Sequence, residues 1–245
     1  MKLPRHPFAV CGRIEQCWLF VHRAPAETVR ALLPPPLEPV IHGGFGFWNV
    51  VVCRLSGMRP FPLPAACGLG YWHVGYRLHA KVATRGGQNL EGLYFVRSNC
   101  DRRVVAWAGN LVTDFRFRTA CIRVTAGEQS VDGTVETADG AASFRIERLA
   151  SAQLADGSPF ATLADAAKAL EYPPRALCPQ GNGALTSVQV RRDPSAWRWR
   201  NVVATEASWA LPGLGGAPLE LCYEVEPIDY LWERGQTIRV ESCAS

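Results

Sequence analysis

The sequence predicts a mostly β, β-rich α+β protein, arranged as an antiparallel double sheet or a closed, barrel-like sheet. Twelve segments have the short apolar or alternating pattern of strands, whereas only two have the pattern of helices. Turn residues separate these segments at the close spacing typical of antiparallel folds. The chain has 245 residues, of which 48% are hydrophobic and 20% charged, enough for a sizeable core. No repeat or linker divides it, so we expect a single domain over residues 1–245.

The expected strands share apolar runs or strict alternation and are bounded by glycine or proline. They cover residues 16–23, 48–55, 71–82, 92–98, 104–112, 115–124, 134–137, 142–149, 186–191, 201–209, 219–226 and 237–240. A hairpin turn is expected at Asp139-Gly140. The first helix, 26–33, follows Pro25 and ends before Pro34, and the second covers 162–170.

Composition narrows the cellular setting and the class of partner. No apolar run is long enough for a membrane span, and the first residues lack the pattern of a secretion signal, so we expect a cytoplasmic protein with no membrane partner. Nine scattered cysteines without a Cys-x-x-Cys pair predict reduced, mostly buried thiols. The net charge of +4 does not require a nucleic-acid partner. Whether the chain forms a homo-oligomer stays open.

Motifs for common cofactors and metals are missing. The chain has no phosphate-binding loop, no strand–G-x-G-x-x-G–helix unit and no nucleophile elbow. The five histidines lack metal-ligand spacing, and His73 and His79, on one strand face, are roughly 20 Å apart. We therefore expect no cofactor and no metal.

One strand carries a row of basic and titratable side chains. In segment 71–82, His73, Arg77 and Lys81 recur every four residues and so project the same way. Such a row is either a solvated sheet face or the polar lining of a cavity. Three further arginines follow on later predicted strands: Arg97, Arg116 and Arg118. Arginines gathered in a cavity need acidic partners or an anionic ligand, because unpaired buried charge is costly. These four arginines are the candidate ligand-binding residues, and a small anionic organic molecule is the expected partner.

A second basic stretch, residues 191–200, interleaves arginines with Trp197 and Trp199. Single-stranded nucleic-acid sites use this composition. A hairpin whose aromatic side chains pack on the sheet explains it equally well and is the favoured interpretation, so nucleic-acid binding is the less favoured one.

Several segments resemble a known family. The run Trp18 to Arg23 and the turn Leu32 to Glu38 are similar to the opening of acetoacetate decarboxylase and its superfamily. Residues 48–60, 92–95, 105–110 and 230–240 resemble its uncharacterised YqjF-like branch. The resemblance implies a cone-like, mostly β barrel around a small-molecule cavity, and it matches Arg77 to an arginine of that branch.

The same resemblance raises a question about activity. The decarboxylases form an imine on a lysine, and their paired lysines align with residues 113–118, where this chain has none. The sequence has 23 arginines and only three lysines, and arginine does not readily form an imine. We therefore expect a cavity protein that binds a small keto or carboxylic acid and transforms it, if at all, without an imine. In that function His73 would exchange a proton near neutral pH. Two alternatives are a non-catalytic interaction module using residues 191–200 and a lyase using Lys81.

Overall fold

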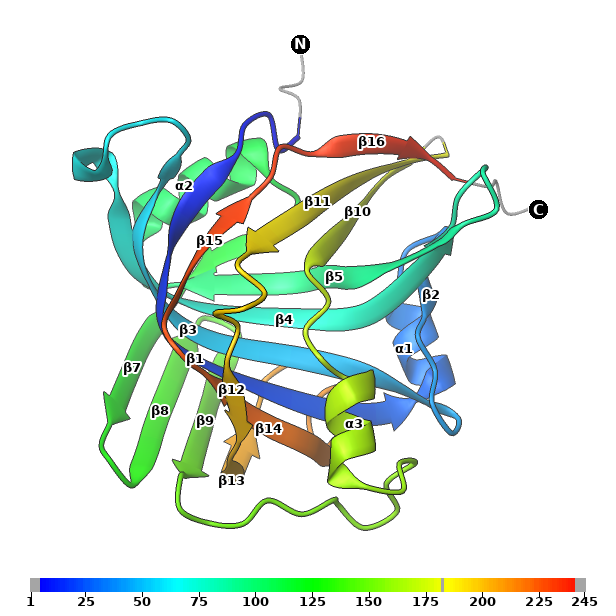
Figure 1. The fold of residues 1–245 in the computed structure, drawn as a ribbon, viewed down its shortest axis with the longest axis vertical. Helices are drawn as coiled ribbons and strands as arrows, with labels where there is room; N and C mark the ends of the chain where they lie inside the picture. Colours follow the sequence, from blue (N-terminus) through cyan, green and yellow to red (C-terminus); the bar gives the residue numbers. More distant parts are fainter. Residues whose placement is uncertain (1–4, 182, 241–245) are drawn as a thin grey trace.

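The computed structural model describes residues 5–181 and 183–240 and shows a mostly β chain, as predicted (Figure 1). Its strands are β1 (Val10–Pro25), β2 (Glu38–Pro39), β3 (Phe45–Pro60), β4 (Leu69–Ala83), β5 (Asn89–Cys100), β6 (Phe117–Thr119), β7 (Cys121–Ala126), β8 (Ser130–Thr137), β9 (Gly140–Glu147), β10 (Arg175–Gly181), β11 (Ala184–Arg192), β12 (Trp199–Asn201), β13 (Val203–Ser208), β14 (Leu219–Val225), β15 (Ile228–Trp232) and β16 (Gln236–Arg239). Its helices are α1 (Ala26–Leu32), α2 (Arg103–Val112), α3 (Leu163–Ala169) and the short 3-10 helix η1 (Ala65–Cys67).

The large sheet closes on itself. Hydrogen-bonded pairing runs from β1 to β3, β4, β5, β10, β11 and β15, and β15 pairs with β1 again. Most of these pairings are antiparallel, as expected, but β5 pairs in parallel with β10 at Leu93 and Ala176. At this closure a Cβ on Gly92 would lie 2.9 Å from the Arg175 carbonyl oxygen, so the approach of the two strands depends on glycine.

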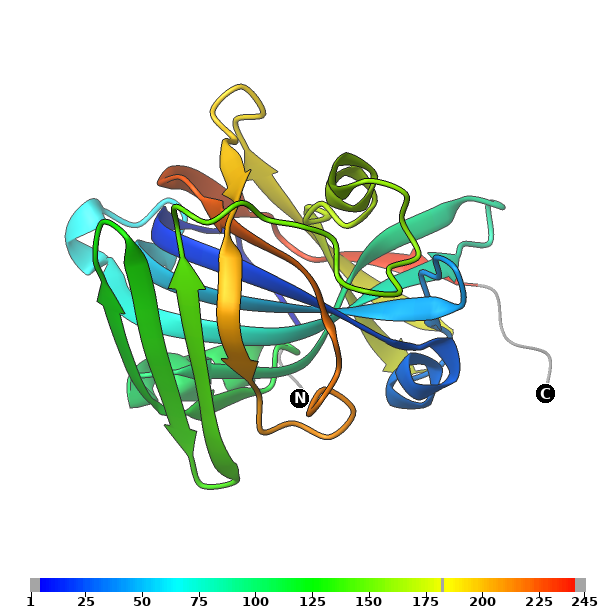
Figure 2. The same cartoon turned by 90° about the horizontal axis from the view of Figure 1, so that it is seen from below.

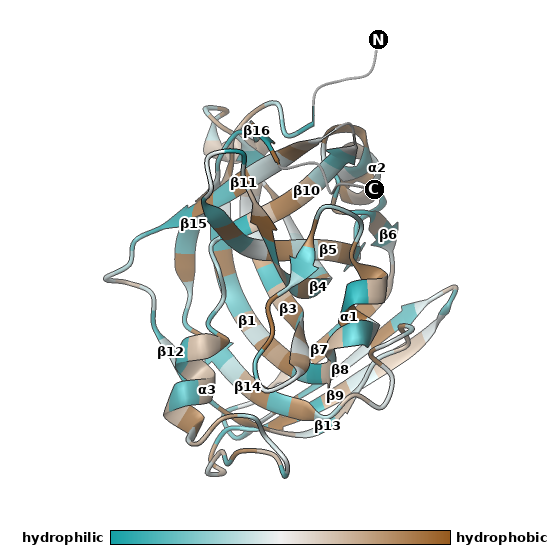
Figure 3. Cartoon of the chain, turned by 90° about the vertical axis from the view of Figure 1, so that its right-hand side faces the viewer, coloured by the Kyte–Doolittle hydropathy of each residue, from teal (hydrophilic) through white to brown (hydrophobic). Residues whose placement is uncertain are grey.

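A second, four-stranded sheet, β13-β9-β8-β7, packs against the outside of this ring as a separate layer (Figure 2). Its hairpin turns between Thr137 and Gly140, at the predicted position. Hydrophobic and hydrophilic residues alternate along the strands (Figure 3). Because of this alternation, the outward side chains of the ring, such as Trp18 and Tyr76, form one core with the second sheet. The inward side chains, such as Leu19 and Val51, form another core inside the ring.

Helices α1 and α3 form where the sequence predicts them. Thr162 caps α3, and its side chain accepts a hydrogen bond from the Asp165 amide at 3.1 Å. The prediction of a strand over 104–112 is wrong, because Arg103–Val112 is helix α2. Its valine and tryptophan content favoured a strand, but Val105, Ala108 and Val112 recur at helical spacing and line the interior of the ring.

Eight cysteines lie in the described part of the chain and all are free thiols, as predicted. Five are buried, two are exposed and Cys11 is intermediate, whereas Cys243 lies outside the described residues. Within the described residues, no helix is both long enough and apolar enough to cross a membrane.

Candidate functional site: a cavity inside the ring

An internal cavity of about 290 Å³ lies inside the ring of strands. Inward-facing side chains of β1, β3, β4, β11 and β15 line it, and α2 covers part of it. Most of the lining is aliphatic or aromatic, including Leu19, Val51, Phe95 and Phe117. The volume is close to the lower end, about 300 Å³, of the usual range for small-molecule sites. The cavity can therefore enclose a compact organic molecule.

Arg77 is the most deeply buried charge in the lining, with 3% of its surface exposed. Its guanidinium donates through Nε to the Asn49 carbonyl oxygen at 3.3 Å and through Nη2 to Asn49 Oδ1. The same group lies 4.8 Å from the centre of the Tyr172 ring and 5.7 Å from that of Phe95. Among the described residues, no carboxylate lies within 4.0 Å of it. Arg77 is thus a buried cation that is oriented by Asn49 and has no acidic partner in the described part of the chain.

A second arginine, Arg192, borders the same cavity and was not among the predicted site residues. Its Cζ lies 3.5 Å from the Trp197 ring centre and 5.2 Å from that of Tyr172, which places both guanidinium groups near one tyrosine. Burial lowers the pKa of Arg192. Val188, Val190 and Arg192 alternate along β11, so extending the predicted strand by one residue would have identified it.

His73 also lines the cavity. It lies four residues before Arg77 on β4, so the two side chains share one face of the strand. Its Nδ1 lies 3.8 Å from Cys53 Sγ, while Nε2 is inaccessible and has no hydrogen-bond partner in the described structure. Burial, reinforced by the positive charge of Arg77, lowers the pKa of His73 to about 3. The imidazole is therefore neutral near pH 7. This neutral imidazole differs from the half-protonated group that the sequence suggested, and its Nε2 is closed to a ligand in this conformation.

The other predicted residues lie elsewhere. Arg97 lies on the outer face of the ring, where its guanidinium pairs with Asp139 at 3.3 Å and lies over the Tyr76 ring. Phe95 pairs with Arg77, but Val96 is an extra, bulged residue, so Arg97 pairs with Tyr76 instead and takes the outward direction.

Arg116 and Arg118 are exposed. Arg118 pairs with Asp139, and Arg116 lies over the Tyr94 ring. The predicted alternation of this segment is correct, but its phenylalanines Phe115 and Phe117 are the side chains that line the cavity. Aromatic rings face the apolar interior because burying them removes a large apolar area from water.

Lys81 is at the far end of β4, opposite Glu91 on β5 and Glu38 on β2. It does not line the cavity, and no lysine among the described residues does. The basic-aromatic stretch is mostly occupied by internal contacts. Arg191 pairs with Glu233 at 2.9 Å, Arg200 pairs with Glu224 at 2.8 Å, and Trp197 lies over Arg192.

Comparison with solved structures identifies the fold. The chain is similar to an acetoacetate decarboxylase-like enzyme from Sphingomonas wittichii RW1, with a TM-score of 0.59 and 14% identity over 97% of this chain and 94% of that one. It is also similar to the enduracididine biosynthesis enzyme MppR complexed with a condensation product of pyruvate and imidazole 4-carboxaldehyde, with a TM-score of 0.57 and 15% identity over 98% and 92%.

A third similar structure is the acetoacetate decarboxylase of Legionella pneumophila, with a TM-score of 0.57 and 13% identity over 99% of this chain and 90% of that one. At these identities the likeness shows the fold alone, which is the acetoacetate decarboxylase-like fold that the sequence predicted. A search of curated proteins found no match. A family model described as an uncharacterized conserved protein, DUF2071, matches residues 15–220, so the chain belongs to the DUF2071 family.

Proposed function

We propose that this protein binds a small organic acid with an apolar body inside the ring, and that Arg77 holds its carboxylate. The observation that carries this proposal is the buried Arg77 guanidinium, which borders the cavity and has no carboxylate within 4.0 Å in the described residues. A buried ion without a counter-ion costs several kcal/mol. A bound anion would remove most of that cost.

The local geometry suits a carboxylate. A guanidinium has five N–H donors, and Arg77 uses two of them on Asn49, which leaves three. Because Asn49 accepts both bonds with its backbone and side-chain oxygens, it fixes the orientation of the group. Arginine binds carboxylates in a planar, bidentate manner, so a preoriented guanidinium is an effective anchor.

The rest of the cavity selects the body of the ligand. Its walls are mainly aliphatic and aromatic, so an acid that places an alkyl or aryl group against Leu19, Val51 and Phe117 would bury apolar area. Each additional buried CH₂ contributes about 0.8 kcal/mol. We therefore expect six-carbon or aromatic acids to bind more tightly than pyruvate, which leaves much of the wall uncovered.

A keto group on such an acid would lie among Arg77, Arg192 and His73. Arg192 could supply positive charge to it, whereas His73 Nε2 is inaccessible and would have to turn before it could bond to the ligand. No imine is part of this proposal, because Lys81 lies outside the cavity. Any transformation of the bound acid would rely on hydrogen bonding and charge.

The proposal is tested with hexanoate, phenylpyruvate, pyruvate and the neutral amide hexanamide as probes. Isothermal titration calorimetry on the wild type should show binding of hexanoate and phenylpyruvate and weaker binding of pyruvate. The neutral hexanamide should bind more weakly than hexanoate, because it lacks the carboxylate. Arg77→Met should weaken hexanoate binding by about 30-fold or more, because truncating one partner of a buried charge pair costs about 2–5 kcal/mol.

Arg97→Met is the matched control, because Arg97 is a similarly buried arginine on the neighbouring strand that faces the other way. It should retain hexanoate binding. If none of the three acids binds the wild type, or if Arg77→Met binds hexanoate as tightly as the wild type does, the proposal is wrong.

A further inference from the structure

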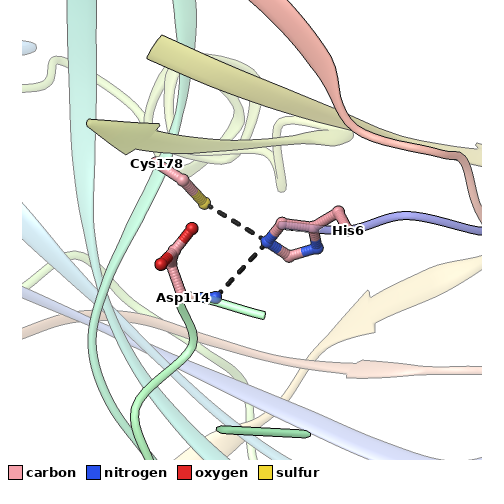
Figure 4. A group of neighbouring side chains, drawn as sticks. All are labelled: His6, Asp114 and Cys178. Carbon is pink, nitrogen blue, oxygen red and sulfur yellow. Dashed lines mark hydrogen bonds between the residues drawn. The ribbon is translucent and has the colours of Figure 1, made fainter. Parts of the chain in front are cut away.

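A cluster of three metal-binding side chains lies at the edge of the ring, and one of them, His6, also borders the cavity that Arg77 lines. His6, Asp114 and Cys178 place one ligand atom each so that all three atoms lie within 4.8 Å of one another (Figure 4). They come from the N-terminal segment, the loop between α2 and β6, and strand β10. No spacing motif in the sequence could reveal a site made from three such distant segments, which is why the sequence predicted none.

We propose that these three residues form a zinc site: His6 through Nε2, Cys178 through its thiolate and Asp114 through a carboxylate oxygen, with water as the fourth ligand. Tetrahedral Zn²⁺ has bonds of about 2.3 Å to sulfur and 2.0–2.1 Å to nitrogen, which puts these two ligand atoms about 3.5 Å apart. The observed separation of Nε2 and Sγ is 3.7 Å. Imidazole with thiolate favours zinc over magnesium or calcium, which prefer oxygen ligands.

The protonation state of the ligands is compatible with a metal. His6 Nε2 faces the Asp114 amide and the Cys178 thiol, both of which are donors, so it carries the lone pair that coordination needs. At present Nε2 accepts only a long contact from the Asp114 amide, at 3.4 Å, and the Cys178 thiol at 3.7 Å (Figure 4). On binding, the thiol releases its proton to solvent, and one thiolate plus one carboxylate balance the two charges of Zn²⁺.

The surrounding structure holds the ligands in place. Asp114 Oδ2 accepts a hydrogen bond from Gln180 at 2.9 Å, and Oδ1 pairs with Arg5 at 3.2 Å. Such contacts orient metal ligands in known sites. Arg5 also competes for the carboxylate, so its guanidinium would keep one oxygen while the other turns to the metal.

His6 itself is held in a left-handed backbone conformation, with a φ of 50°, which costs about 1–3 kcal/mol for a residue other than glycine. Its amide donates to the Val112 carbonyl at 2.6 Å, and its carbonyl accepts from the Gly235 amide at 2.9 Å. A Cβ on Gly235 would lie 2.9 Å from that of His6, so this close approach requires glycine. The backbone contacts of His6 with Val112 and Gly235 thus fix the position from which its imidazole reaches Cys178.

A cysteine nucleophile activated by His6 is the competing interpretation, and the structure disfavours it. The backbone amide of Asp114 donates to the same nitrogen that faces the thiol, and no hydrogen bond from the ring to the Asp114 carboxylate orients the imidazole in the described structure, as a triad would require.

Cobalt provides the test, since Co²⁺ takes the place of zinc and its bond to a thiolate gives a charge-transfer absorption in the near ultraviolet. Untagged full-length protein should bind one equivalent of Co²⁺ with this band, and added Zn²⁺ should abolish it. The band should be lost in Cys178→Ser and weakened in His6→Ala, and it should persist in Cys222→Ser, a matched buried cysteine in the other core.

Zinc should also raise the melting temperature of the wild type and not that of Cys178→Ser, because binding to the folded state alone stabilises it. A wild type without the band overturns the proposal, whether or not the variants fold. So does a band that survives in folded Cys178→Ser, which would assign it to another thiol such as the exposed Cys67.

Discussion

Replacing Arg77 with methionine should stabilise the protein in the absence of ligand, although it should weaken ligand binding. Arg77 as a whole residue is 3% exposed, and the polar partners of its guanidinium in the described structure are the two oxygens of Asn49. The effective penalty of burying such an ion is several kcal/mol. Methionine has a similar length and no charge, so it avoids this penalty without leaving a large void.

Two losses oppose that gain. Asn49 Oδ1 loses its donor, which costs about 1–3 kcal/mol for a buried acceptor. The contact of the guanidinium with the Tyr172 ring at 4.8 Å also disappears, about 0.5–2 kcal/mol, but sulfur–aromatic contacts replace part of it. The balance is an increase of roughly 1–2 kcal/mol in the free energy of unfolding, or about 3–6 °C in melting temperature for a chain of this size.

Urea unfolding followed by tryptophan fluorescence, together with thermal unfolding, measures this change without ligand. Arg97→Met should move the other way, because it breaks the 3.3 Å pair with Asp139 and the contact with Tyr76. If Arg77→Met lowers the free energy of unfolding by more than about 1 kcal/mol, Arg77 is a structural group and the argument for an anion site fails.

Three further predictions concern the fold, the pH dependence and the chemistry. Gly92→Ala should destabilise the chain by about 1–3 kcal/mol, because its Cβ would lie 2.9 Å from the Arg175 carbonyl oxygen where β5 meets β10. In the control Gly86→Ala the new Cβ would lie 3.8 Å from its nearest neighbouring atom, so the urea midpoint should change little; equal destabilisation by the two substitutions would contradict this. Burial lowers the pKa of His22 from 6.5 to about 4, so the unfolded chain binds the proton first and stability should fall as the pH drops from 6.5 towards 4. His22→Gln can still accept the Trp209 hydrogen bond and should reduce this slope by up to about 1.4 kcal/mol per pH unit in urea titrations from pH 5 to 7.5; an unchanged slope would refute the assignment. Borohydride treatment with pyruvate should leave Lys81 without added mass in peptide mass spectrometry, because Lys81 lies outside the cavity, whereas a trapped adduct would restore the imine alternative.

Much of the fold could be predicted because strand periodicity is local. The alternation along 71–82 correctly separated Tyr76, in the outer core, from Arg77, in the cavity. The segment 104–112 was mispredicted because its residue types favour a strand, while packing over the ring favours a helix. That competition is decided by contacts between distant segments, which residue propensities do not contain.

The site was harder to predict than the fold for the same reason. Alternation shows that Phe117 and Arg118 point in opposite directions, but not which direction is inward. One bulged residue, Val96, turns Arg97 to the outer face. Asn49 is a polar residue within a buried apolar run of the sequence. Because a buried polar group needs a hydrogen-bond partner, its position could have indicated a polar contact inside the fold.

By itself, the sequence determined a mostly β chain with an apolar interior, reduced cysteines and few lysines, because these properties depend on composition and on a period of two residues. Only the tertiary structure decided which basic groups share a cavity. Ring closure brings Arg192 of β11 to Arg77 of β4 around Tyr172. It also brings Cys178 of β10 to His6 and Asp114. Both groupings depend on register and ring closure, which are set by the packing of the whole chain and not by any single segment.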